Sequence, residues 1–339
     1  MEPRASMVSA GSPERQLEQH RRELTGYCYR MLGSPFEAED AVQETMLRAW
    51  RGLERFEGRA ALRSWLYRIA TNVCLDALDG RARRARPVDL GPAAEPVEAS
   101  LNAPPEVTWI EPIPLGLVAP DDPAQQAEER ETLRLAFIAA LQHLPPRQRA
   151  ALILVEVLRW KASEAAELLE TTTAGINSAL QRARATLEAS GVSQGDPMPE
   201  MDAEQRALLA RYVEAFEAYD IDRLTDVIRE DAIQSMPPFD LWLEGRESIF
   251  RWFFGPGIGC RGSRLIPVDS ANGAPAFGQY KPSESGVGYD PWAVCVVELA
   301  EHGVKELTFF LDTQRLFPLF GLPPRLDEEG EGQPASRPA

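Results

Sequence analysis

One stretch near the middle of the chain carries side chains that can read nucleic-acid bases. Residues 171–187, TTTAGINSALQRARATL, place polar side chains three or four positions apart, on one face of a helix. Amide and guanidinium groups can make paired hydrogen bonds to adenine and guanine edges in a major groove. The outward row and its flanks comprise Thr173, Asn177, Ser178, Gln181, Arg182 and Arg184. The stripe expected to pack comprises Ile176, Leu180, Ala183 and Leu187.

This helix is the last of three that the sequence predicts between residues 144 and 187. Pro145 and Pro146 suit the first turn of the first helix, and Ser163 is a candidate N-cap of the second. A break at 171–173 leads into the third helix, whose first turn Gly175 weakens by about 1 kcal/mol relative to alanine. Three helices in this order are typical of a helix-turn-helix. Because many such units contact no DNA, the pattern alone favours DNA binding without establishing it.

A second helix pattern, PFEAEDAVQETMLRAWR at 35–51, has two distinct faces. Ala38, Val42, Met46 and Ala49, with Trp50 beside them, are expected to form a buried stripe. The opposite face carries Asp40, Gln43, Glu44, Leu47 and Arg51. One interpretation is a solvated face with a single exposed leucine. The other is a protein-docking surface with Leu47 at its centre and charged groups at its rim.

The pattern at 62–78, LRSWLYRIATNVCLDAL, predicts a helix that buries Leu62, Leu66, Ile69 and Val73. Trp65, Arg68 and Asn72 follow one edge, and the basic run RARRAR comes after it. Aromatic rings interleaved with arginines suit single-stranded nucleic acid, because rings stack on bases while cations follow the backbone. The alternative is that Trp65 and Tyr67 are ordinary core aromatics.

The charge of the chain is unevenly distributed. The formal net charge is −16 over 339 residues, which argues against nucleic acid as a partner because phosphate binding requires basic side chains. Residues 51–86, however, hold nine arginines against four acidic residues, a local charge of +5. The whole-chain average therefore hides a basic segment.

Composition gives no support for a metal site, a cofactor or a membrane segment. Cys28, Cys74, Cys260 and Cys295 are widely spaced, and the histidines are only His20, His143 and His302, so buried free thiols are the favoured interpretation. Apolar runs such as ALILVEVL are far shorter than the roughly 20 residues of a membrane span. We expect a cytoplasmic protein with no signal peptide, no metal and no cofactor.

The composition divides the chain into several segments. Helical patterns cover 15–86 and 126–188, joined by a linker rich in Pro, Ala and Glu at 87–125. A second linker at 189–202 precedes a block at 203–323, where helices give way to alternating strand patterns. Residues 324–339 are expected to be an acidic, disordered tail. The fold class is multidomain, with two all-α domains followed by an α+β domain.

The stretches EAEDAVQETMLRAW and FEGRAALRSWLYRIATNVCLDALDGRARR closely resemble domain 2 of bacterial sigma factors of the extracytoplasmic-function group. The resemblance implies that the row Asp40, Gln43, Glu44, Leu47 and Arg51 docks on the β′ clamp of core RNA polymerase. It also implies that the following helix binds the −10 promoter strand and holds an extruded base, whose cost a preformed pocket can offset. The residues implied at −10 are Gly58, Arg59, Ala60, Leu62, Arg63, Trp65, Arg68, Asn72, Arg81, Arg83 and Arg84.

LPPRQRAALIL and the polar helix after it resemble sigma domain 4, which implies a partner in the β flap and binding of the −35 element through the row at 173–184. Asn177 stands where the family often has Lys or Arg, which implies a less basic contact. The linker around VTWIEPIPLGLVAP, stiffened by Trp109, Pro112 and Pro114, is either a disordered tether or, as in the family, a segment threading through polymerase.

The block at 203–323 resembles the cone-shaped α+β fold of SnoaL-like polyketide cyclases and ketosteroid isomerases. The resemblance implies a pocket, for which Trp242, Trp252, Phe253, Phe254 and Tyr280 are candidate lining residues, with a small apolar molecule as the ligand. Most of these aromatics also suit plain core packing. His302 lies between two strand patterns and is expected in a hairpin, and no Asp–His pair has a spacing that supports catalysis.

These observations favour an alternative sigma factor, with no catalytic residues, whose C-terminal domain regulates it in cis. A second hypothesis is a ligand-sensing helix-turn-helix regulator that acts without joining polymerase. The face around Leu47 discriminates between them, because such a regulator has no need of a polymerase-docking surface. A third hypothesis, an enzyme built on the cone domain, lacks an acid–base pair.

Overall fold

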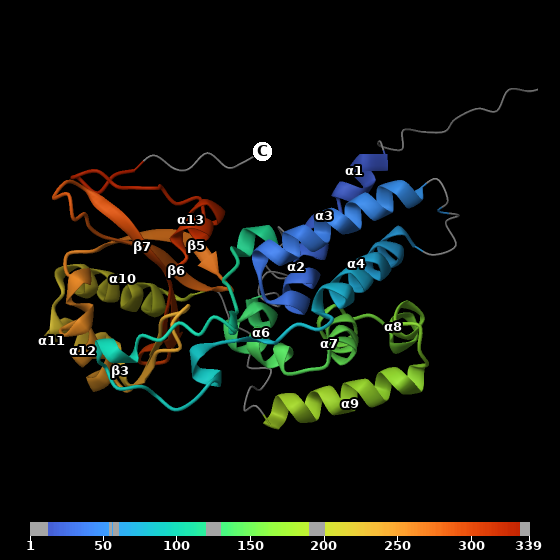
Figure 1. Cartoon of the computed structure of the whole chain (residues 1–339), viewed down its shortest axis with the longest axis horizontal. Coiled ribbons are helices and arrows are strands. Elements are labelled where there is room, and N and C mark those ends of the chain that lie inside the picture. The colour runs from blue at the N-terminus through green and yellow to red at the C-terminus, as the bar shows by residue number, and fades with distance from the viewer. Residues whose placement is uncertain (1–12, 54–55, 57–60, 120–129, 190–200, 333–339) are drawn as a thin grey trace, which may run out of the picture. The chain divides into compact units, whose positions relative to one another are not determined.

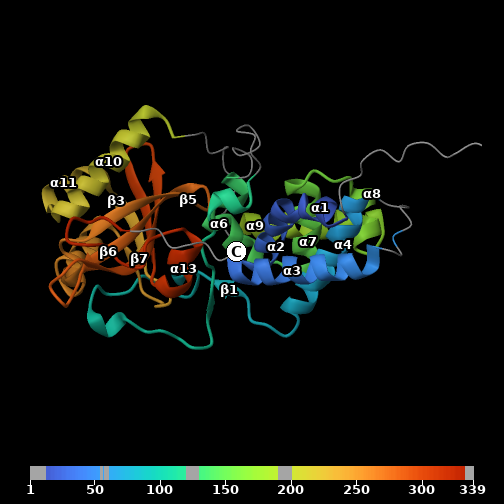
Figure 2. The same ribbon diagram turned by 90° about the horizontal axis from the view of Figure 1, so that it is seen from above.

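The computed structural model describes residues 13–53, 56, 61–119, 130–189 and 201–332 (Figures 1 and 2). The chain forms two compact units. The helical unit comprises residues 1–81, 117–120 and 140–193, and the sheet unit comprises 82–116, 121–139 and 194–339. The linker expected at 87–125 therefore belongs mainly to the sheet unit.

The helical unit begins with a bundle of helices around two tyrosines. Its helices are α1 (Pro13–Glu18), α2 (Arg21–Leu32), α3 (Pro35–Gly52) and α4 (Leu62–Leu78). The rings of Tyr27 and Tyr67 meet edge to face, 5.2 Å apart, and the Tyr27 hydroxyl lies 2.7 Å from the Thr71 hydroxyl. Burial raises the pKa of Tyr27, so this hydroxyl stays protonated inside the bundle.

The buried faces of α3 and α4 differ in part from expectation. On α3, Ala38, Val42 and Ala49 are buried, but Trp50 is 56% exposed, because one residue past Ala49 turns about 100° away from the core. On α4, Leu66 and Val73 are buried as predicted, whereas Leu62 and Ile69 are only half-buried. Tyr67 and Thr71 occupy the centre instead, since both contact Tyr27.

The remaining helices of this unit form the predicted three-helix pattern. They are α7 (Pro146–Leu152), continued by a π-helical turn (Ile153–Val157), α8 (Ala162–Leu168) and α9 (Thr173–Ala189), preceded by α6 (Leu135–Gln142). The expectation that Ser163 caps the second helix is wrong. The α8 helix begins one residue earlier, and the Glu164 carboxylate accepts a hydrogen bond from the Lys161 backbone amide at 2.9 Å.

A buried arginine holds this part of the unit together. The Arg149 guanidinium donates hydrogen bonds to the Gln142 side chain at 2.7 Å and to the carbonyls of Gln142 and Leu144. It also donates to the carbonyl of Met31 at the end of α2. Burial lowers the pKa of Arg149 to about 10, so the group remains charged at neutral pH.

The sheet unit contains a six-stranded sheet in the order β4-β3-β8-β7-β6-β5. Strands β3 and β8 pair in parallel, and the other neighbours pair antiparallel. The strands are β3 (Ile228–Ser235), β4 (Trp242–Glu244), β5 (Arg264–Ala271), β6 (Ala274–Pro282), β7 (Tyr289–Ala300) and β8 (Gly303–Phe310). His302 lies in the turn between β7 and β8, as predicted.

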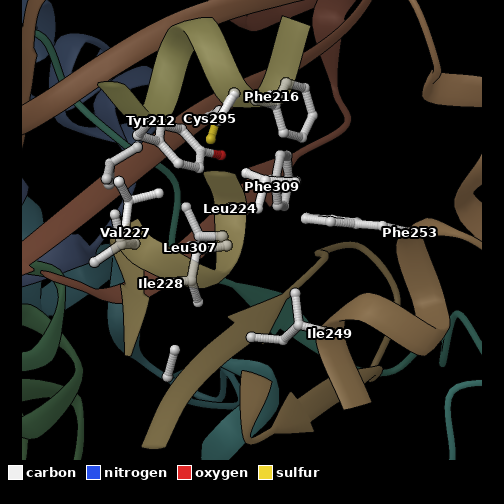
Figure 3. Close-up of a cluster of buried hydrophobic side chains, with 14 of the residues drawn as sticks. Tyr212, Phe216, Leu224, Val227, Ile228, Ile249, Phe253, Cys295, Leu307 and Phe309 are labelled. Carbon is white, nitrogen blue, oxygen red and sulfur yellow. The ribbon is translucent and has the colours of Figure 1, made fainter. Parts of the chain in front are cut away.

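Helices enclose the hydrophobic core of the sheet. They are α10 (Ala203–Ala218), α11 (Ile221–Val227), α12 (Arg246–Phe253) and α13 (Thr313–Leu319). The core gathers Phe216 from α10, Phe253 from α12 and Phe309 from β8 (Figure 3). Residues 313–319 were expected to continue the strand pattern but form α13, because the Asp312 side chain caps the first turn at the Arg315 amide.

Two segments expected to be unstructured pack against the sheet unit. In the linker, β1 (Arg84–Ala85) and β2 (Thr108–Trp109) pair in parallel. At the other end of the unit, Leu326 is only 3% exposed and exchanges two backbone hydrogen bonds with Tyr289. Leu326 therefore lies against β7, and the rest of the expected tail, 333–339, falls outside the described residues.

Candidate functional site

The polar row of α9 is exposed along its length. Ile176, Leu180, Ala183 and Leu187 are all buried, which confirms the predicted stripe. The expected base-reading residues, Thr173, Asn177, Ser178, Gln181, Arg182 and Arg184, are all exposed. The Arg184 guanidinium pairs with the Glu156 carboxylate at 2.6 Å. The row thus presents amide, hydroxyl and guanidinium groups to solvent.

The start of α9 explains its unusual glycine. The Thr172 hydroxyl accepts a hydrogen bond from the Gly175 amide at 3.0 Å, which caps the helix. A Cβ atom on Gly175 would lie 2.6 Å from the Thr171 hydroxyl. Glycine therefore leaves room for the turn between α8 and α9, and its helix-weakening effect is offset by this fit.

The candidate docking row on α3 is exposed around one apolar side chain. Leu47 is 41% exposed, Asp40, Gln43 and Arg51 are exposed, and Glu44 is half-buried. The Glu44 carboxylate accepts a hydrogen bond from Arg48 at 2.6 Å. Trp50, which was expected to pack inward, is exposed one turn along the same helix. An exposed leucine and tryptophan on a charged helix are typical of a protein contact.

The candidate −10 surface on α4 is largely engaged by the protein itself. The Arg63 guanidinium donates to Glu23 at 2.7 Å and lies over the rings of Tyr67 and Trp160. Trp65 is half-buried against Phe56, 4.9 Å between ring centroids. Asn72, further along this helix edge, is exposed.

The remaining residues expected at −10 have different surroundings: some form ion pairs, some are exposed, and some fall outside the described residues. Arg68 pairs with Glu167 of α8 at 3.6 Å, and Arg81 pairs with Glu37 at 2.9 Å. Arg83 is exposed. Arg84 lies in the sheet unit, where its guanidinium donates to the Trp109 carbonyl. Leu62 is half-buried at the start of α4, while Gly58, Arg59 and Ala60 fall outside the described residues.

The five aromatics expected to line a pocket are distributed over different surroundings. Trp252 and Phe253 belong to the hydrophobic core, and Phe254 is exposed. The Tyr280 hydroxyl donates to the Pro323 carbonyl at 2.7 Å. Trp242 donates from its indole nitrogen to the carbonyl of Gly91 in the linker at 2.9 Å. Trp252, Phe253 and Tyr280 therefore serve the buried interior, Trp242 contacts the linker, and Phe254 lies at the surface.

A cavity lies between the linker and the sheet, and it holds about 10 Å³, room for a single water molecule. Its walls come from linker residues such as Arg86 and Ile110 and from sheet residues such as Ser235 and Thr308.

Among the described residues, no three His, Cys, Asp or Glu side chains come together as a metal site. Cys28, Cys74, Cys260 and Cys295 are free thiols, and burial raises the pKa of Cys295 to about 12. Among the helices that the structure describes, none is long and apolar enough to cross a membrane.

Sequence reasoning missed Asn272, in the turn between β5 and β6. Its side chain is buried and hydrogen-bonds backbone groups of Ile113 in the linker and of Leu133, two residues before α6. The dipeptide Asn272-Gly273 is a signal for a tight hairpin turn, which could have placed the residue. Nothing in the linker sequence indicates the contact, because the linker contributes backbone groups.

Comparisons with known proteins agree with this architecture. Residues 17–84 match the family described as Sigma-70 region 2, and residues 134–187 match Sigma-70, region 4. The ECF RNA polymerase sigma factor SigG of Mycobacterium tuberculosis strain H37Rv is 47% identical over 313 residues, covering 91% of this chain and 83% of that protein. The ECF RNA polymerase sigma factor SigJ of the same strain is 30% identical over 218 residues, covering 64% and 62%.

The fold is similar to the crystal structure of the M. tuberculosis extracytoplasmic function sigma factor SigJ. The TM-score is 0.57 at 20% identity, with 88% of this chain and 96% of that chain covered. The likeness includes helical domains followed by a sheet-containing region. Because the relative SigG is nearly half identical over most of both sequences, the chain belongs to the ECF RNA polymerase sigma factors, which are alternative sigma factors of transcription initiation.

Proposed function

We propose that this sigma factor contacts core polymerase through α3 and reads its promoter through α4 and α9. Asp40, Gln43, Glu44, Leu47 and Arg51 would dock on the β′ clamp, and domain 4 on the β flap. The observation that supports this division most strongly is that α3 and α9 each bury one stripe and expose the opposite polar row. Two exposed rows on separate helices suit two separate partners.

The two promoter contacts differ in chemistry. On α9, Gln181 and Arg182 can hydrogen-bond base edges of the −35 element in the major groove. On α4, the exposed amide of Asn72 can hold a base extruded from the −10 strand, and Trp65 and Arg63 would follow that strand. Chemistry on a substrate has no place in this proposal, because binding alone opens the −10 region.

The acidity of the chain fits this division of work. A net charge of −16 weakens the attraction of the free protein to DNA, because phosphate binding depends on basic side chains. Core polymerase would supply most of the nonspecific phosphate contacts. The basic segment at 51–86 then acts only where polymerase places it.

The docking surface is tested by copurification with core RNA polymerase. Leu47→Glu places a charge at the centre of the row and is expected to abolish copurification and promoter-specific run-off transcription. Ile258→Glu is the matched control, because Ile258 is 46% exposed in the sheet unit, close to the 41% of Leu47. Copurification that survives Leu47→Glu would instead support a helix-turn-helix regulator that acts without joining polymerase.

The sheet unit is the proposed regulatory domain, a SnoaL-like cone that acts in cis. The contacts of Trp242 and Asn272 with the linker support this role. Since the candidate pocket aromatics are in the core, at the surface or against the linker, the linker itself is the favoured target of regulation. Deletion of residues 199–339 would expose Ile113, which is fully buried, so point variants test this role more cleanly.

A further inference from the structure

Arg184 of the recognition helix α9 is held by a carboxylate from an earlier part of the chain. Its Nε and Nη2 atoms both lie 2.6 Å from one oxygen of Glu156, which precedes it by 28 positions. The Glu156 side chain is 14% exposed, whereas that of Arg184 is 59% exposed. The carboxylate therefore lies behind the guanidinium, and the arginine faces the solvent.

An irregular turn supplies this carboxylate. Glu156 lies in the π-helical turn Ile153–Val157, where the Leu158 amide donates to the Ile153 carbonyl at 2.9 Å. Arg159, just after the turn, has a left-handed backbone with φ 58°, which is uncommon for a residue other than glycine. Because π-helical turns within helices occur frequently at functional sites, the ion pair that this turn supplies is a candidate for a functional role.

The pairing fixes which end of the guanidinium is presented outward. Glu156 binds the edge formed by Nε and Nη2, so the end formed by Nη1 and the outer hydrogen of Nη2 is turned away from it. Two parallel N–H groups at that end match the two oxygens of a phosphate group. Since a long side chain loses rotamer freedom when it binds, a carboxylate that restricts Arg184 beforehand lowers the entropic cost of this contact.

The place of Arg184 on α9 indicates a phosphate rather than a base as its target. Recognition helices contact base edges mainly through their N-terminal residues. Arg184 lies eleven positions after Thr173, the first residue of α9. That spacing is about 16 Å along the helix axis. It exceeds the width of a major groove, about 12 Å, so the arginine would reach a strand that borders the groove.

The carboxylate also offsets the positive charge of this arginine. Nonspecific binding to DNA depends on cations that neutralise phosphates wherever the protein meets the duplex. An arginine that is paired and held in one direction contributes little to such binding. It still makes a charge-assisted hydrogen bond when the helix is seated so that a phosphate lies in line with the guanidinium.

We infer that Glu156 is a positioning residue for specificity, which holds Arg184 so that it contacts a −35 phosphate only when α9 is seated in its base-reading register. The inference rests on the proposed contact of α9 with the −35 element. It makes Arg184 a phosphate contact, and it leaves base reading to the residues before it, among them Gln181 and Arg182.

The first test measures binding of the full-length free protein to a duplex of random sequence, by fluorescence anisotropy over a range of salt concentrations. Glu156→Ala releases Arg184 and should strengthen this binding about three- to tenfold, with a log Kd against log salt slope steeper by about 0.9, the value for one phosphate contact. Arg184→Ala, added to Glu156→Ala, should restore the weak binding. Glu301→Ala is the control for net charge, because Glu301 is 92% exposed in the sheet unit.

The second test measures discrimination by the protein bound to core RNA polymerase. The Kd for a promoter is compared with the Kd for the same promoter with a scrambled −35 element. Glu156→Ala should lower their ratio about three- to tenfold, because the released arginine contacts phosphates in any register. Glu156→Gln keeps an oxygen that accepts from Arg184 but removes the negative charge, so its ratio should fall between those of the wild type and Glu156→Ala. Parallel weakening on both promoters would mean that Glu156 only supports the fold, and would overturn the inference.

The outcomes separate this inference from the function on which it rests. If Glu156→Ala changes neither the salt slope nor the ratio while Gln181→Ala lowers the ratio, α9 reads the −35 element and the role of Glu156 is wrong. If the wild type does not distinguish the two promoters, the proposed −35 contact fails, and the inference fails with it even where the salt slope shows a restrained Arg184.

Discussion

The recognition helix α9 and the −10 helix α4 present their candidate DNA-binding residues in opposite states. On α9 the row is exposed, and its member Arg184 pairs with Glu156. On α4, Arg63 and Arg68 are paired with Glu23 and Glu167. A helix that packs on one side only, such as α9, keeps its polar side chains free to bind a partner. A helix that packs on two sides, such as α4, must first break the ion pairs that those side chains form within the protein.

Part of the contacts made by the side chains of α4 are with residues of domain 4. Trp160 stacks on Tyr67, 5.1 Å between centroids, beneath the Arg63 guanidinium. Glu167 belongs to α8, the helix before the recognition helix. Separation of the two domains would therefore free the side chains of Arg63 and Arg68 on α4 from these contacts.

The largest effect is expected at Asn72, an exposed side chain on the α4 edge. Asn72→Ala removes the amide proposed to hold an extruded base, and extrusion costs a few kcal/mol. We expect run-off transcription to fall about thirtyfold with an unchanged melting temperature. Asp76→Ala is the control, since its contact with Arg48 is an exposed pair at 3.8 Å. Equal losses in the two variants would remove the special role of Asn72.

A somewhat smaller effect is expected on α9. Gln181→Ala removes a side chain that can make paired hydrogen bonds to a base, each pair being worth about 1–3 kcal/mol. Transcription from a promoter with a −35 element should fall about tenfold, measured against Glu188→Ala near the end of the same helix. If both variants behave alike, the exposed row is a solvated face rather than a reading surface.

The two units should also respond differently to pH. Burial, followed by the charge of Glu298, raises the pKa of Glu306 in β8 to about 6, while Arg86, Lys305 and Arg134 oppose the shift. The folded protein then holds this proton more tightly than the unfolded chain does. Its stabilising contribution is complete below the unfolded pKa and is lost as pH rises through about 6.

Denaturant unfolding measures this response. The sheet unit should gain about 1 kcal/mol between pH 7 and pH 5 from Glu306 alone. Glu306→Gln should remove that gain and leave the helical unit unaffected. A pH dependence that persists in Glu306→Gln would place its origin elsewhere.

The smallest effect tests whether domain 4 restrains α4. Glu167→Gln frees Arg68 from a pair at 3.6 Å, and exposed pairs contribute at most about 1 kcal/mol. Binding of the free protein to a single-stranded −10 oligonucleotide should rise about twofold, measured by fluorescence anisotropy. Glu170→Gln, an exposed neighbour, is the control. A decrease would mean that Glu167 supports the surface instead of restraining it.

Sequence periodicity predicted the buried residues correctly where a helix packs through one face only. The buried stripe of α9 was predictable because its four buried residues all lie on one side of the helix. On α4, Tyr67 is drawn inward by Tyr27 while Trp65 packs on Phe56, so two sets of contacts rotate the buried face. Such contacts depend on tertiary structure and leave no periodic signal.

The linker was the least predictable part of the molecule. Its prolines and alanines are typical of a tether, yet Ile113 is fully buried and bound through its backbone. Backbone groups are the same at every non-proline position, so the sequence does not mark which of them will find a partner. The contact became apparent only through Asn272, whose turn signal lies some 160 residues away in the chain.

The two-point reading of the promoter is tested most directly by run-off transcription with core polymerase on templates randomised in the −35 and −10 elements. Sequencing the transcribed templates gives the base preferences of the wild type, Asn72→Ala and Gln181→Ala. The proposed roles predict that Asn72→Ala relaxes preference only within −10 and Gln181→Ala only within −35. Preferences that change at both elements together, or at neither, would contradict the assignment of one element to each helix.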